Sequence, residues 1–234
     1  MNTRTPEQFK KRGTWQRLQQ WRWQRMQQWR HHRNRQDLIN DALELLAFNG
    51  IQGDYVEFGC HGAETLPIAY RVSNLLRPKR QLWAIDHFQG IPAPREFRDL
   101  HPRWQEGERL TTELQFRKLC TRAGVPEHAY RLIHAPFDQL GALDRNTVPD
   151  NIAMAWVNCH LHSQVDAVLN FLEPRLKQGM ILAFDHYFAY SRFHCSGDRS
   201  ALLSLQSRAH GFRICPYRNF GLTGATFVVE EAMA

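Results

Sequence analysis

The chain has 234 residues, of which 43% are hydrophobic, and its formal net charge is +7. This length suffices for one large domain with a buried core, and no apolar run approaches the roughly 18 residues that a membrane span needs. The N-terminus lacks the apolar segment of a secretory signal. The five cysteines are scattered and form no Cys-x-x-Cys pair, which argues against a disulfide framework and a thiolate zinc site. We therefore expect a reduced, cytoplasmic protein.

The positive charge is concentrated in residues 1–35, which hold ten Lys or Arg residues against the single acidic residue Glu7. On a helix, five apolar residues of this segment fall within an arc of about 140°. The sequence therefore predicts a basic helical arm over residues 1–35, followed by one domain over residues 36–234. The apolar residues of the arm are Trp15, Leu18, Trp21, Met26 and Trp29.

An apolar stripe of this kind is usually covered by protein, so the favoured interpretation is a lid that docks on the body or on a second subunit. We expect a homo-oligomer in which the arm contacts the partner. A basic helix rich in tryptophan also suits an anionic membrane surface, and contact with nucleic acid is the weakest alternative.

Beyond the arm, strand-like apolar segments alternate with segments of helical periodicity. This alternation predicts an α/β fold with an open, doubly wound, mostly parallel sheet and helices on both of its faces. The predicted helices span residues 37–48, 65–76, 108–124 and 164–176. The predicted strands span residues 55–58, 81–86, 130–135, 152–159, 180–187, 211–217 and 224–230.

In such a sheet, ligands bind at the carboxyl ends of the strands. The first strand runs into the glycine turn "GDYVEFGCHGAET", which has Glu57 where a dinucleotide fingerprint has its first glycine. A carboxylate there would repel a pyrophosphate but would attract the amine and sulfonium of S-adenosylmethionine. Asp86, at the end of the second strand, would bind both ribose hydroxyls. The sequence therefore favours S-adenosylmethionine over a nicotinamide cofactor.

Three segments resemble the class I methyltransferases of the macrocin O-methyltransferase (TylF) family: "DYVEFGCHGAET", "LWAIDHFQGIP" and "LKQGMILAFDHY". The resemblance extends from about Gln36 to Glu230. It implies a Rossmann-like sheet of seven strands and S-adenosylmethionine-dependent O-methylation of a small-molecule hydroxyl, on a sugar or another secondary metabolite. The residues expected to contact the cofactor are Glu57, Gly59, Cys60, Gly62, Thr65, Asp86, His87, Phe137 and Asn158.

The resemblance also implies a divalent ion, usually magnesium, held by carboxylates after the fourth and fifth strands. This chain departs from that pattern, because Asn158 stands where the first metal aspartate is expected and His160 and His186 stand where further acids are expected. Asn158, Asp185 and His186 remain the candidate metal ligands, and the imidazole favours manganese or another nitrogen-tolerant ion over magnesium.

The candidate catalytic residues are His160, Asp185 and His186. Without a metal, either histidine could act as the general base, with Asp185 as its orienting partner. With a metal, His160, His162 and His194 could add nitrogen ligands, or these histidines could be structural. An alternative function is a noncatalytic or metal-independent protein that binds S-adenosylmethionine and acts through its arm on a partner or a membrane surface.

Overall fold

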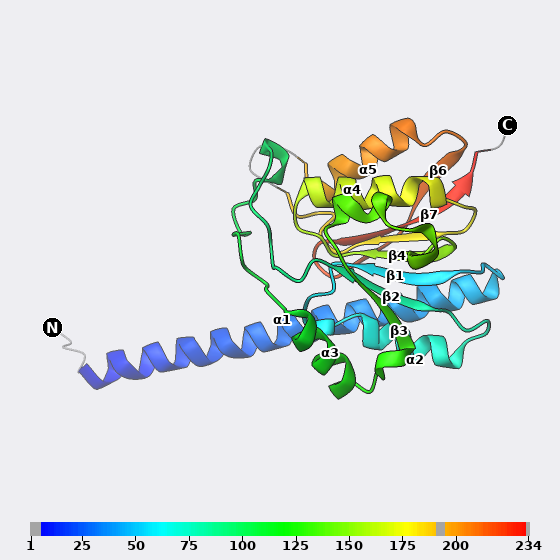
Figure 1. Cartoon of the computed structure of the whole chain (residues 1–234). Coiled ribbons are helices and arrows are strands. Elements are labelled where there is room, and N and C mark those ends of the chain that lie inside the picture. Colours follow the sequence, from blue (N-terminus) through cyan, green and yellow to red (C-terminus); the bar gives the residue numbers. More distant parts are fainter. Residues whose placement is uncertain (1–5, 191–194, 233–234) are drawn as a thin grey trace.

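The computed structural model describes residues 6–190 and 195–232. A seven-stranded sheet with strand order β3-β2-β1-β4-β5-β7-β6 forms its centre (Figure 1). The pairs among β1 to β5 are parallel, whereas β7 is antiparallel to β5 and β6. The predicted fold and all seven predicted strands are therefore confirmed. The strands are β1 (Asp54–Phe58), β2 (Leu82–Asp86), β3 (Tyr130–His134), β4 (Ile152–Val157), β5 (Ile181–Phe184), β6 (Phe212–Phe220) and β7 (Gly224–Glu231).

Helices cover both faces of the sheet, as predicted (Figure 1). The helices α1 (Pro6–Phe48), α2 (Leu66–Leu75) and α3 (Glu113–Arg122) pack on one face. The helices α4 (His162–Leu172) and α5 (Gly197–Arg208) pack on the other. Successive strand residues alternate between the two cores: Val56 and Phe58 face α4 and α5, whereas Tyr55 faces α1 and α2. The sequence analysis did not predict α5.

The expected division at residues 35 and 36 falls inside α1, a continuous helix of 43 residues. Its C-terminal part packs on the sheet through Leu38, Ile39 and Leu43, whereas its N-terminal part projects away from the body (Figure 1). The exposed fractions of the predicted stripe residues lie between 47% at Leu18 and 65% at Trp15. In the part of the chain that the structure describes, the stripe therefore does not dock on the chain's own body. No described helix is long and apolar enough to cross a bilayer.

Helix boundaries follow local side-chain chemistry. Pro67 lies in the first turn of α2, where its missing N–H group costs nothing. Helix α3 begins at Glu113, later than predicted, because Thr112 and Gln115 form a capping box. The Gln115 amide donates to the Thr112 hydroxyl at 3.3 Å, and the Thr112 amide donates to the Gln115 side chain at 2.9 Å. The preceding residues consequently remain a loop above the carboxyl ends of the strands.

The turn after β1 requires a glycine at one position. Gly59 has a φ of +85°, and a Cβ atom there would lie 2.5 Å from the carbonyl oxygen of Asn158, which follows β4. Ala63, later in the same turn, also adopts the left-handed region, with a φ of 52°. The close approach of the backbones after β1 and β4 therefore depends on the missing side chain of residue 59.

We predict that Gly59→Ala costs more stability than Gly124→Ala. Gly124 also has a positive φ, of +82°, but its Cβ position has no atom within 4 Å, so this variant reports the cost of backbone strain alone. Gly59→Ala adds a clash with the Asn158 carbonyl, worth about 1–3 kcal/mol beyond that strain. Urea unfolding of both variants measures the difference. Equal losses would contradict the close packing of the two strand ends.

Candidate active site

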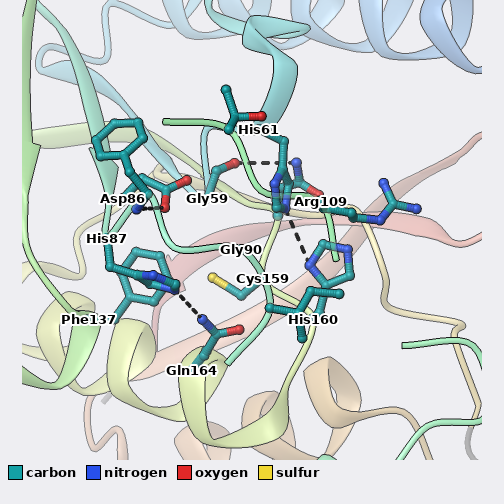
Figure 2. Close-up of a pocket in the computed structure, with 14 residues that line it drawn as sticks. Gly59, His61, Asp86, His87, Gly90, Arg109, Phe137, Cys159, His160 and Gln164 are labelled. Carbon is teal, nitrogen blue, oxygen red and sulfur yellow. Dashed lines mark hydrogen bonds between the residues drawn. The ribbon is translucent and has the colours of Figure 1, made fainter. Parts of the chain in front are cut away.

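A pocket opens at the carboxyl ends of β1 and β4, where the strand order reverses (Figure 2). This is the position at which doubly wound sheets bind nucleotides. The structure brings six of the predicted site residues to this pocket: Gly59, Asp86, His87, Phe137, Asn158 and His160. The pocket also contains His61, Arg109 and Gln164, which the sequence analysis did not single out.

Asp86 is held in a fixed orientation at the end of β2. Its Oδ2 accepts a hydrogen bond from the backbone N–H of Cys60 at 2.7 Å, and its Oδ1 accepts one from that of Phe88 at 2.8 Å. Each carboxylate oxygen can accept a second hydrogen bond. The geometry therefore leaves Asp86 able to accept hydrogen bonds from two neighbouring hydroxyls, as a ribose requires.

An aromatic wall stands beside Asp86. The rings of His87 and Phe137 meet edge to face with centroids 5.8 Å apart, and the Gln164 side chain, from α4, lies 3.1 Å from Nε2 of His87 (Figure 2). Phe137 is buried at the start of a short 3-10 helix, Phe137–Ala142. This wall offers a flat apolar surface and an amide, which are the groups that an adenine ring needs.

Glu57 lies behind the turn and does not line the pocket. It is fully buried, the Tyr55 hydroxyl donates to its Oε2 at 3.1 Å, and its Oε1 has no hydrogen-bond partner among the described residues. Burial raises the pKa of Glu57 to about 8, although Thr65, Tyr55 and the charge of Arg35 act in the opposite direction. Glu57 is therefore protonated at neutral pH in the absence of a further cation.

The predicted cofactor residues Cys60, Gly62 and Thr65 also lie outside the pocket lining. Cys60 and Thr65 are buried in the turn, where Cys60 orients Asp86 through its backbone and Thr65 precedes α2. Direct contact of the cofactor with these residues and with Glu57 stays a prediction.

Three histidines meet at the far side of the pocket. His61 Nε2 lies 3.4 Å from His160 Nδ1, and the ring centroids of His160 and His186 are 4.6 Å apart. Trp104 lies edge-on to His160 and His186, with centroid separations of 5.2 and 5.5 Å. The buried Nε2 atoms of His160 and His186 have no partner within the described chain.

Burial favours the neutral imidazoles at this cluster. It lowers the pKa of His160 well below its ordinary value and lowers the pKa of His186 to about 4. Both rings are therefore uncharged at neutral pH, so each has one ring nitrogen with a free lone pair that can accept a hydrogen bond.

A larger cleft, of about 780 Å³, adjoins the pocket. Arg109 lines both cavities. Asp185 and His186, which directly follow β5, line the cleft. One wall comes from α1, which contributes Gln28, His31, His32 and Arg35. Sequence analysis assigned Arg35 to the arm, and no local pattern marks it as part of the site.

The predicted metal ligands Asn158, Asp185 and His186 stay a prediction. Among the described His, Cys, Asp and Glu residues, only Glu96, Asp99 and His162 bring three potential ligand atoms together. These are already bonded to one another and to the chain: His162 Nδ1 lies 2.6 Å from Glu96, and Asp99 accepts hydrogen bonds from Ser163. They therefore fasten the loop after β2 to the start of α4. His194 lies outside the described residues.

Comparison with known proteins agrees with the fold. The family model described as macrocin-O-methyltransferase (TylF) matches residues 2–198, so the match includes the arm, which we expected to lie outside the family. No curated protein matches the chain. The chain is similar to the calicheamicin methyltransferase CalS11, with a TM-score of 0.65, 19% identity and coverage of 85% of this chain and 80% of that one.

Two further solved structures share the fold. The O-methyltransferase NovP has a TM-score of 0.63, 17% identity and coverage of 85% of this chain and 80% of that one. TomG from Streptomyces achromogenes, solved in complex with SAM, has a TM-score of 0.55, 13% identity and coverage of 84% and 80%. On the strength of the family match, the chain belongs to the macrocin O-methyltransferase (TylF) family and is an S-adenosylmethionine-dependent O-methyltransferase that acts on small molecules.

Proposed function

We propose that the acceptor is a sugar or another secondary metabolite whose hydroxyl enters the cleft beside α1, while S-adenosylmethionine occupies the pocket between β1 and β4. The observation that carries this proposal is the junction of the two cavities at Arg109, with His160 on the pocket side and His186 on the cleft side. Methyl transfer needs a donor and an acceptor aligned across such a junction.

The proposed roles follow the lining of each cavity. Asp86 binds the ribose hydroxyls, and His87 and Phe137 hold the adenine. His186 accepts the hydroxyl proton, because its buried Nε2 lacks a partner in the described chain and its ring lines the cleft. His160 lies closer to the cofactor and shapes the junction.

Two variants separate these roles in a methyl-transfer assay with a panel of hydroxyl acceptors. His186→Asn should lower kcat by about 10²–10⁴-fold, the usual contribution of a general base, with unchanged affinity for S-adenosylmethionine. Asp86→Ala should lose most of a micromolar cofactor affinity, about −8 kcal/mol, in calorimetry. Full activity of His186→Asn would transfer the role of base to His160, and unchanged cofactor affinity of Asp86→Ala would contradict the placement of the ribose.

Glu57 should make the stability of the protein depend on pH. Its pKa is raised by burial to about 8, so the folded chain keeps a proton that the unfolded chain loses near its ordinary value. The stabilisation of the folded state by this proton is complete below the pKa of Glu57 in the unfolded chain. It is lost as the pH rises through the folded-state pKa of about 8. Between pH 6 and pH 8, the free energy of unfolding of the wild type, measured with urea, should fall by about 2 kcal/mol more than that of Glu57→Gln.

The same measurement with saturating S-adenosylmethionine tests the predicted role of Glu57. If the cofactor's cationic group pairs with the carboxylate, the ligand should lessen this loss because it favours the ionised form. An identical pH dependence with and without the ligand would argue that Glu57 is purely structural.

For the arm, we propose a homodimer in which the exposed stripe of Trp15, Leu18, Trp21, Met26 and Trp29 packs on the body of the partner. Its exposure in the single chain supports the need for a cover, because large exposed apolar surfaces promote association. Arginines lie over the faces of two arm tryptophans, at 5.2 Å for Arg25 and Trp21 and at 5.5 Å for Arg33 and Trp29. Packing of one arm against another would bring like charges together, so the body is the better partner.

Deletion of residues 1–30 should reduce the mass measured by light scattering and weaken acceptor binding, because the partner's arm would no longer cover the cleft. A protein that keeps its dimeric mass but loses salt-sensitive sedimentation with anionic vesicles would show instead that the arm binds membranes. A variant with unchanged mass, activity and vesicle behaviour would contradict both roles.

The free state of all five cysteines supports the proposal that the protein works in a reducing compartment such as the cytoplasm.

A further inference from the structure

The carboxylate after β5 is bound by an arginine that reaches it from α1. Arg35 Nε lies 3.3 Å from Asp185 Oδ1, and Nη2 lies 2.5 Å from Oδ2, so the contact is bidentate. The third nitrogen, Nη1, pairs with Glu64 beside the glycine turn. Only 16% of the Arg35 side chain and 7% of the Asp185 side chain are exposed. The pair is therefore a fixed part of the site rather than a mobile surface contact.

The residues present do not fit the divalent ion that the family resemblance implied. Magnesium prefers hard oxygen ligands, and Asp185 is the only acid among the candidate positions, with both of its oxygens engaged by Arg35. The amide nitrogen of Asn158 is turned to the carbonyl of Gly59, at 3.3 Å. Within the described ranges, the nitrogens of the histidine cluster do not converge with a carboxylate into a ligand set.

Arg35 keeps its positive charge in this setting. Its burial acts to lower the pKa, but Asp185, Glu64 and Glu57 act more strongly in the other direction, and the pKa of Arg35 is raised. A permanent cation thus lies among three carboxyl groups next to the cleft that receives the acceptor.

We propose that Arg35 takes the place of a divalent ion in this active site, as a positioning residue that neutralises Asp185 and so lowers the repulsion that the acceptor oxygen meets as its negative charge develops. This inference rests on the proposed function. The acceptor hydroxyl gives its proton to His186, and its oxygen forms a bond to the methyl carbon. The carbon–sulfur bond breaks with its electron pair retained by sulfur, so the products are an ether, a neutral thioether and a proton. Without Arg35, the charge on Asp185 would oppose the developing negative charge on the acceptor oxygen.

Arg35→Ala tests the proposal with Arg33→Ala as its matched control, because Arg33 lies two residues away with 64% of its side chain exposed. Both variants lose one positive charge from α1. Arg35→Ala should lower kcat by about 10²–10³-fold, with unchanged cofactor affinity and partial restoration by added guanidinium. Arg35→Lys should retain an intermediate rate, whereas Arg33→Ala should match the wild type. Thermal unfolding by circular dichroism confirms that each variant is folded.

Metal dependence is measured independently of activity. Wild-type protein titrated with Mn²⁺ in a calorimeter should show no micromolar site, and EDTA should leave methyl transfer unchanged. Micromolar Mn²⁺ binding that Asp185→Ala removes would overturn the proposal, as would an Arg35→Ala variant as active as Arg33→Ala. If the wild type methylates no hydroxyl acceptor, the proposed function fails, whereas the Mn²⁺ titration still decides whether Asp185 is a metal ligand.

Discussion

The contact between the backbones that follow β1 and β4 sets the geometry of the whole site. The carbonyl oxygen of Asn158 occupies the space that a side chain at position 59 would need. This packing lets the two central strands end at the same level, so that the turn after β1 can present its backbone to Asp86. The pocket proposed for the cofactor then opens at the point where the order of parallel strands reverses. The cleft proposed to receive the acceptor lies beside it and shares Arg109 with it.

A second constraint is the balance of charge beside that pocket. Asp185, the exposed Glu64 and the fully buried Glu57 would repel one another if all were ionised. Arg35 binds the first two, and Glu57 remains protonated because burial raises its pKa to about 8. The imidazoles of His160 and His186 are kept neutral by burial as well. The site therefore holds most of its ionisable groups uncharged or paired until ligands arrive.

The sequence was sufficient to predict the sheet because each strand is a short apolar run bounded by turn residues, and the carboxylate at Asp86 marks its own position at a strand end. It was insufficient for α5, where serine, arginine and glutamine interrupt the apolar pattern between residues 197 and 208. It also missed Arg35, whose partner Asp185 is 150 residues away. A contact at that separation depends on how α1 packs across the sheet, which no local pattern encodes. The tryptophan stripe was recognisable, but the sequence did not show that it stays exposed on the single chain.

Helix α1 connects the exposed arm with the site, since the same helix carries the arm and brings Arg35 to Asp185. The central claim is that a guanidinium, and not a metal, accompanies Asp185 during methyl transfer. The most direct measurement is a crystal structure with S-adenosylhomocysteine, grown with Mn²⁺ and recorded at the manganese absorption edge. The account predicts ribose hydroxyls on Asp86, an intact bidentate Arg35–Asp185 pair and no anomalous peak beside His186. A manganese peak bound by Asp185, with Arg35 displaced, would contradict it.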